Sequence, residues 1–251
     1  MPNARVAAHC REIDRCNQRG GRMLSVVDLI EAGTLTIDVA AYCLAAIRAG
    51  ASFMVGALPG GAGKTTVMGA LLNFVPPGVT LAPADSLPAI EGAMRRAQPR
   101  RCYICHEIGS GAYYAYLWGR ELRAYFELPG AGHMLATNLH ADTCEAARAQ
   151  VCLDNGVSAE AFARMNLLLF LSLHRAGGRI VRRISTVWES DGVCPHGCVY
   201  EAGGRSSLGD ATALVPAERL ACARGVIDLL VERGARTIEE VRGVIVDEME
   251  S

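Results

Sequence analysis

A glycine-rich loop between an apolar run and a helical stripe constrains the fold of this chain more than any other feature of its sequence. The loop spans residues 58–66 and reads LPGGAGKTT. Residues 52–56 before it are of strand type, and residues 65–72 after it place their apolar side chains on one helical stripe. Strand, glycine loop and helix in this order turn backbone N–H groups and a helix N-terminus toward one anion. The sequence therefore predicts a phosphate-binding loop, and the alternative is a glycine-rich turn that holds a lysine by accident.

The only lysine of the chain lies in this loop. Lys64 is one of 25 basic residues, and all the others are arginines. A compact ammonium group fits between phosphate oxygens, where the wide guanidinium fork of arginine does not. We therefore expect Lys64 to reach the outer phosphates of a nucleotide and the hydroxyl of Thr65 to bind Mg²⁺. The expected nucleotide-binding residues are Gly60, Gly61, Ala62, Gly63, Lys64, Thr65 and Thr66.

The loop departs from the usual G-x-x-x-x-G-K-T spacing at one position. The first glycine of that pattern falls at position 58, where this chain has Leu58. Because a leucine is poorly suited to a left-handed backbone, we expect Gly56, Gly60 and Gly61 to supply the bend instead.

Composition excludes some partners. The chain has 251 residues, 20% of them charged, and a formal net charge of −1. This balance does not favour nucleic acid or an anionic membrane as the main partner. Residues 1–22 are polar and show no signal peptide, and the longest purely apolar run, Leu167–Leu171, is far shorter than the roughly 18 residues of a membrane span. We expect a cytoplasmic protein.

Two cysteine clusters could be mistaken for cofactor sites. Residues 102–106 spell C-x-x-C-H, the haem-attachment pattern, but they read as a buried strand without an export signal. Cys194, His196 and Cys198 offer two thiols and an imidazole, whereas structural zinc takes four ligands. A turn between two strands is favoured for this segment, and metal binding there stays open.

The order of elements predicts an α/β fold with a mostly parallel sheet. Strands are expected at 52–56, 79–81, 102–107 and 133–140, and helices at 36–48, 65–73, 86–97, 112–127 and 143–152. An edge hairpin is expected at 167–173 and 179–188, turning at residues 176–178. A C-terminal helical appendage follows, with helices at 217–232 and after a capping box of Thr237 and Glu240. The predicted domains are a polar leader (1–22), a core (23–190), and a linker with a helical subdomain (191–251).

Polar residues mark the ends of two predicted strands. Glu107 ends the strand at 102–107, where its carboxylate could hold a metal-bound water or polarise an attacking one. The alternative is a solvated glutamate at a strand end. Thr137, Asn138 and His140 cluster at the end of the next strand, on the ligand side of an open α/β sheet. We expect this cluster to contact or sense a γ-phosphate.

These motifs together resemble the type II and type IV secretion, pilus and archaellum ATPases. The resemblance runs from Leu24 to Glu189 and rests on the Gly-x-Gly-Lys-Thr-Thr loop, the strand ending in Glu107, and Gly132-His133 with Thr137-x-x-His140-Ala141. In that family the last stretch is the histidine box. The resemblance implies a P-loop ATPase fold, ATP and Mg²⁺ as ligands, and catalytic roles for Glu107 and His140, with Glu107 also near the metal.

The resemblance also implies an assembly. Members of the family form homo-oligomeric rings, usually of six, and act on an inner-membrane platform protein from the cytoplasm or the inner face of the membrane. An arginine finger is then expected from a neighbouring subunit, and the candidates are Arg95, Arg96, Arg120 and Arg123.

The chain departs from this family at three further places. The acidic box of the second strand is replaced by residues 79–85, which retain only Asp85, and Ile108-Gly109 stand where the family often has an arginine. Residues 1–23 precede the matching region in place of a separate N-terminal domain. A second function therefore stays open, a nucleotide-binding structural or regulatory subunit with weak or no ATPase activity. Partitioning ATPases are disfavoured because they need a second lysine where this chain has Pro59.

Overall fold

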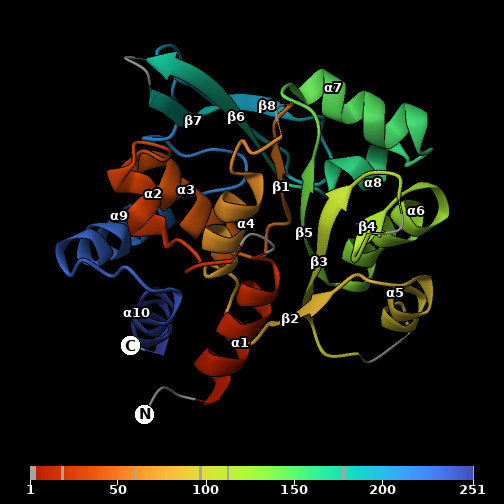
Figure 1. The fold of residues 1–251 in the computed structure, drawn as a ribbon, viewed down its shortest axis with the longest axis horizontal. Helices are drawn as coiled ribbons and strands as arrows, with labels where there is room; N and C mark the ends of the chain where they lie inside the picture. Colours follow the sequence, from red (N-terminus) through yellow and green to blue (C-terminus); the bar gives the residue numbers. More distant parts are fainter. Residues whose placement is uncertain are drawn as a thin grey trace.

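The fold is built on one mixed sheet with helices on both faces (Figure 1). The computed structural model describes residues 4–17, 20–58, 60–95, 98–111, 113–176 and 179–250. In spatial order the strands are β2 (Thr80–Pro83), β3 (Arg101–Ile108), β5 (Met134–Leu139), β1 (Phe53–Gly56), β6 (Leu167–Ala176), β7 (Arg179–Glu189) and β8 (Gly197–Glu201). The short strand β4 (Tyr116–Leu117) pairs with β3.

The sheet is parallel from β2 to β6 and antiparallel from β6 to β8. The central strand β1 lies between β5 and β6, so the loop that follows it emerges from the middle of the sheet. The predicted fold class, a mostly parallel sheet with an edge hairpin and C-terminal helices, is confirmed. The predicted hairpin turn falls on Gly177 and Gly178, which lie outside the described residues.

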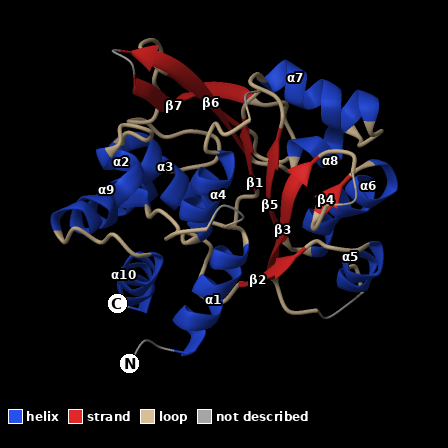
Figure 2. Cartoon of the chain, viewed as in Figure 1, coloured by secondary structure: helices blue, strands red, loops and turns tan. Residues whose placement is uncertain are grey.

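Helices cover the two faces unequally (Figure 2). One face carries α1 (Ala4–Arg15), α2 (Val26–Glu31), α3 (Ile37–Arg48), α4 (Lys64–Leu72), α9 (Ala217–Glu232) and α10 (Ile238–Glu250). The other carries α5 (Leu87–Ala93), α6 (Gly119–Glu127), α7 (Cys144–Arg148) and α8 (Ala159–Ala163). A 3₁₀ turn at Leu128–Ala131 follows α6, and a π-helical turn at Ala149–Asp154 follows α7.

Alternation along the strands divides the core into two apolar clusters. In β1, Phe53 and Val55 belong to the cluster under α3, α4 and α9, whereas Met54 belongs to the cluster under α5 to α8. Successive side chains of a strand point to opposite faces of the sheet, so one strand serves both clusters. Because β1 is completely buried on both faces, the loop after it starts from a fixed position.

The N-terminal segment differs from the prediction of a polar leader. Residues 4–15 form α1, which packs against α10 and buries Val6, Cys10 and Ile13 along one stripe. The prediction was wrong for these residues because arginines and acids separate the apolar positions, whose i, i+3/i+4 spacing still makes one buried face. Residues 18 and 19 of the expected leader lie outside the described residues.

The helix expected at 112–127 is shorter in the structure. Only Gly119–Glu127 is helical, and Tyr116 and Leu117 instead pair with β3. Ala115 and Gly119 adopt left-handed backbone conformations, with φ of 54° and 57°, and these interrupt any helix through them. Ala112, where the expected helix begins, lies outside the described residues, as do Arg96 and Ala97 at the end of the helix expected at 86–97.

The C-terminal helices follow the sequence prediction. Glu240 N donates to Thr237 Oγ1 over 3.1 Å, and Thr237 N donates to Glu240 Oε2 over 3.0 Å, which is the expected capping box. The helix α9 packs on α3, and α10 packs on α1, so the appendage covers the face that also carries α4. Within the described part of the chain, every helix is too short or too polar to cross a membrane.

Candidate functional site

The glycine-rich loop connects the buried end of β1 to the first turn of α4. Gly63 is the N-cap of α4 with φ of 98°, and Gly61 has φ of 78°. Both positions need glycine because a side chain strains a left-handed backbone. The N-terminus of α4 has no side-chain cap, so its first N–H groups are available to an anion in the loop.

Of the three glycines that the sequence analysis named for the bend, Gly61 supplies it, together with Gly63. Gly60 has open space around its Cα, so a Cβ at this position would meet no neighbouring atom. Gly56 is needed for close approach, since a Cβ there would lie 2.5 Å from the carbonyl oxygen of Ala141. Leu58 has a negative φ and an exposed side chain, which explains why the loop forms without a glycine at position 58. Pro59 lies outside the described residues.

Residues from three separate elements meet beside the loop. Lys64 Nζ lies 3.6 Å from Glu107 Oε2 and 3.4 Å from His140 Nδ1, and His140 Nε2 lies 3.9 Å from Glu107 Oε1. Lys64 begins α4, Glu107 is in β3, and His140 directly follows β5. Strands β3 and β5 are neighbours and parallel, so their carboxyl ends bring the last two residues to one edge.

Burial and charge set the protonation of Glu107. The residue is 7% exposed, and this burial raises the pKa of its carboxyl group. The charges of Lys64 and His140 act in the opposite direction but do not cancel the effect of burial. Glu107 Oε1 is buried and has no hydrogen-bond partner within the described residues, which is costly unless a ligand or water supplies a donor.

The three residues line a pocket together with the loop, which we call the loop pocket. Its volume is about 410 Å³. It is lined by residues 60–66 with Asn17, Gly20, Arg22, Met23, Leu24, Glu107, Tyr116 and His140. The pocket thus holds the seven expected residues of the loop together with Glu107 and His140.

The residues present fit a magnesium ion. Thr65 is half-buried and lines the loop pocket, as Glu107 does. A hydroxyl and a carboxylate with an unused oxygen are the oxygen donors that Mg²⁺ prefers, usually through water. A cage of three or more His, Cys, Asp or Glu side chains does not occur within the described residues, and this includes Cys194, His196 and Cys198.

Thr137 and Asn138 do not reach the loop pocket. The hydroxyl of Thr137 donates to the carbonyl oxygen of Asn138 over 3.2 Å. Asn138 Nδ2 donates to the carbonyl oxygen of His106 over 2.9 Å and so ties β5 to β3. Of the cluster expected to contact a γ-phosphate, only His140 lines the loop pocket.

The arginine-finger candidates lie away from the loop pocket. Arg120 pairs with Glu91 at 3.1 Å, and Arg123 donates to the carbonyl oxygen of Asn155 over 2.8 Å. Arg95 is exposed, and Arg96 lies outside the described residues. None of the three described candidates lines the pocket of its own subunit.

Arg182 is a residue of this site that the sequence analysis missed. It lies on β7 of the edge hairpin, and its Nε and Nη2 atoms both donate to the carbonyl oxygen of Gly61 over 3.4 Å. A Cβ at Gly63 would lie 3.4 Å from Arg182 Cδ, so the side chain crosses the loop closely. Only the pairing of β6 and β7 brings it there, and no local pattern near position 182 marks it.

Comparisons with known proteins give limited matches. No model of a known protein family matches the chain, and no curated protein matches it. Among solved structures, the chain is similar to the VirB11 ATPase of the Brucella suis type IV secretion system, with a TM-score of 0.47 and 18% identity over 64% of this chain and 54% of that one. It is also similar to the ATPase DotB of Legionella pneumophila, with a TM-score of 0.39 and 12% identity over 94% of this chain and 65% of that one. The chain therefore spans less than two thirds of the length of either protein.

Proposed function

We propose that this chain is an ATP-binding and ATP-hydrolysing motor subunit of a secretion, pilus or archaellum-type machine. The observation that supports the proposal is the meeting of Lys64, Glu107 and His140 at one end of the phosphate-binding helix. A lysine ammonium group and a carboxylate that can orient the nucleophile are groups that phosphoryl transfer uses, and both lie here beside the glycine loop.

Phosphate binding would use the loop and its lysine. The outer phosphates of ATP would accept hydrogen bonds from the backbone N–H groups at the start of α4, while the ammonium of Lys64 contacts their oxygens. At 3.6 Å the ion pair of Lys64 with Glu107 is longer than a charge-assisted hydrogen bond of about 2.7–2.9 Å.

Hydrolysis would use the unpartnered oxygen of Glu107. Water attacks the γ-phosphorus while the bond to the β–γ bridging oxygen breaks, so the products are ADP and phosphate. Glu107 Oε1 orients this water and takes up its proton, which the raised pKa of the carboxyl group favours. His140 contacts the γ-phosphate from the exposed side of the loop pocket. Mg²⁺, when bound by Thr65 and water near Glu107, neutralises negative charge on the phosphate oxygens.

Assembly is part of the same proposal. The motor would act as a homo-oligomer, in the cytoplasm or at the inner face of the membrane, on an inner-membrane platform protein. An arginine of a neighbouring subunit would complete the site. Arg95, Arg120 and Arg123 suit this role in one respect, since all three are exposed.

The alternative function is a nucleotide-binding structural or regulatory subunit with weak or no ATPase activity. The position of Asp85 favours it. This residue follows the edge strand β2, is exposed, and does not line the loop pocket, so β2 supplies no second carboxylate to the site. Glu107 is then the one acidic residue of the pocket, among the described residues, that could activate water.

Steady-state ATP turnover with Mg²⁺ and nucleotide-binding titrations separate the two functions. The motor proposal expects wild type to bind and hydrolyse ATP, and Glu107→Gln to bind ATP but lose turnover by about 10²-fold or more. Lys64→Ala is the matched variant that should lose both properties. If wild type binds ATP but its turnover equals that of Glu107→Gln, hydrolysis is excluded and the alternative stands. If wild type does not bind ATP, both functions are wrong.

A further inference from the structure

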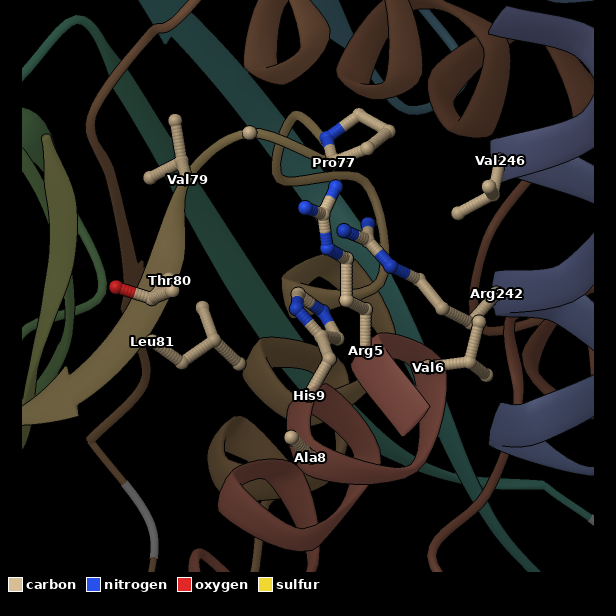
Figure 3. A pocket seen from close by; sticks show the side chains of 11 residues that line it. Arg5, Val6, Ala8, His9, Pro77, Val79, Thr80, Leu81, Arg242 and Val246 are labelled. Atoms are coloured by element: carbon tan, nitrogen blue, oxygen red, sulfur yellow. The ribbon is translucent and has the colours of Figure 1, made fainter. Parts of the chain in front are cut away.

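A second pocket lies at the opposite end of α4 from the loop, between α1 and α10 (Figure 3). We call it the α1–α10 pocket. Its volume is about 370 Å³, and its walls are α1, α10 and the segment from Pro77 to Leu81 that leads into β2. Since α4 has nine residues at about 1.5 Å each, roughly 13 Å of helix separates the two pockets.

Two guanidinium groups extend into the α1–α10 pocket from different helices. Arg5 comes from α1 and Arg242 from α10, and both side chains reach the space below Pro77 (Figure 3). The rest of the lining is mostly apolar, including Val6, Val79 and Val246, and no carboxylate belongs to it within the described residues. The pocket therefore combines positive charge with an apolar wall.

Arg242 is only partly used by the fold. It is 2% exposed, and its Nη1 atom donates to the carbonyl oxygens of Asn73 and Val75, just beyond the end of α4. Both hydrogen bonds are made by Nη1, and neither is made by Nε or Nη2. Burial lowers the pKa of Arg242 to about 10, so the group remains charged near neutral pH. A buried charge without a counter-charge is costly, and an anion beside it would relieve that cost.

His9 adds a polar wall without adding charge. Its Nε2 atom lies 3.0 Å from the carbonyl oxygen of Leu72, and the ring is 7% exposed. Burial and the nearby charge of Arg242 lower the pKa of His9 to about 3, so the ring is neutral near pH 7. Among the acids of the same helices, Asp14 and Glu239 line a different hollow, and Glu12, Glu240 and Asp247 are not part of the lining of the α1–α10 pocket.

We propose that the α1–α10 pocket binds a small organic anion, a carboxylate or phosphate carried on a short apolar body. The anionic group would lie against Nε and Nη2 of Arg242 and beside Arg5, since a guanidinium fork matches two oxygens of such a group. The apolar body would lie against Val6, Val79 and Val246. This site is independent of ATP hydrolysis and does not depend on the function proposed above.

Methyl NMR titration of the full chain tests the proposal. The probes are hexanoate and hexyl phosphate, with hexanol as the uncharged match and acetate as an anion without an apolar body. The reporters are the methyl groups of Val6, Val79 and Val246, which lie away from the loop pocket. We expect saturable shifts with hexanoate or hexyl phosphate, and at least about 10-fold weaker binding of hexanol and acetate, because a charged hydrogen-bonded contact is lost in one and the apolar contact in the other.

Variants of α1 complete the test. Arg5→Gln removes one guanidinium of the pocket, and Arg11→Gln makes the same charge change at an exposed position outside it. We expect Arg5→Gln to weaken hexanoate or hexyl phosphate binding by about 5- to 10-fold and Arg11→Gln to leave it unchanged. The proposal is overturned if neither anion gives saturable shifts, if hexanol or acetate binds as tightly, or if the two variants behave alike.

Discussion

Lys64 and Glu107 form an ion pair of 3.6 Å between two side chains that are 7% and 9% exposed. The pair joins the first residue of α4 to the penultimate residue of β3. Its position next to an uncapped helix N-terminus means that an incoming phosphate would compete with Glu107 for the same ammonium group.

Substitutions of Lys64 should separate the effect of its charge on ATP affinity from the effect of its shape. We expect Lys64→Ala to weaken ATP binding by about 100-fold, because a charge-assisted contact to phosphate is lost. Lys64→Arg should restore less than a tenth of the lost affinity, since the guanidinium fork is too wide for the loop. Isothermal titration with ATP measures both effects. Equal affinity of Lys64→Arg and wild type would show that only the charge matters.

Glu107→Gln should change stability in a pH-dependent way. Burial raises the folded-state pKa of this carboxyl group above its unfolded value, so wild type loses stability as the pH rises through the folded pKa. We therefore expect Glu107→Gln to melt at a higher temperature than wild type above that pKa. The difference should shrink as the pH falls toward the unfolded value of about 4.3. Calorimetry across this range would contradict the assignment if the variant is less stable at every pH.

Arg182 should contribute to nucleotide affinity through the loop. We expect Arg182→Gln to weaken ATP binding by about 5- to 10-fold, because the two hydrogen bonds to Gly61 that hold the loop are lost. Arg183→Gln is the matched control, since Arg183 is exposed and lies on the other face of β7. Fluorescence titration with a labelled nucleotide compares the two. Equal nucleotide affinities of the two variants would show that Arg182 does not contribute to nucleotide binding.

Two glycines near the loop should respond differently to alanine. We expect Gly56→Ala to destabilise the fold by about 1–3 kcal/mol, because its Cβ would overlap the backbone oxygen of Ala141 and the ring of Phe170. Gly60→Ala should change stability by less than about 0.5 kcal/mol, since the space around Gly60 is open. Urea unfolding measures both, and a reversed order would contradict the loop geometry.

His9 should make the fold sensitive to mild acid. Its folded pKa is lowered to about 3 from an ordinary value of 6.5, so the unfolded chain takes up a proton first as the pH falls. We expect about 2 kcal/mol of stability to be lost between roughly pH 7 and pH 5 from this residue. His9→Gln keeps a donor for Leu72 but cannot titrate, so its unfolding free energy should fall less over this range. Parallel slopes for both proteins would exclude His9 as the cause.

Most of the fold could be predicted from local patterns, because these elements depend on residues that are close together in the sequence. The strand, loop and helix around Lys64 and the capping box of Thr237 depend on such short-range spacing. The helix expected from residue 112 was wrong because the left-handed backbone at Ala115 is set by pairing with β3, which lies elsewhere in the sequence. The stripe of α1 was missed because charged residues separate its apolar positions.

The site residues that could be predicted from the sequence are those at the carboxyl ends of strands. Glu107 and His140 stand at or near the carboxyl ends of neighbouring parallel strands, and such ends meet at one edge of a sheet. Arg182 could not be found this way because it reaches the loop from an antiparallel strand of the edge hairpin. The prediction that Thr137 contacts a γ-phosphate together with His140 was wrong. Successive residues of a strand point to opposite faces of the sheet, and Thr137 points away from the face that bears His140.

His9 and Arg242 bind the carbonyl oxygens at the C-terminal end of α4, and these contacts have a mechanical consequence. A short α-helix behaves as a rigid rod, and this rod ends at Lys64 on one side and at the two closing side chains on the other. A force applied to α10 is therefore also applied to the carbonyl end of α4, and we expect it to be transmitted along the helix toward Lys64. We therefore expect a displacement of α10 to shift the glycine loop.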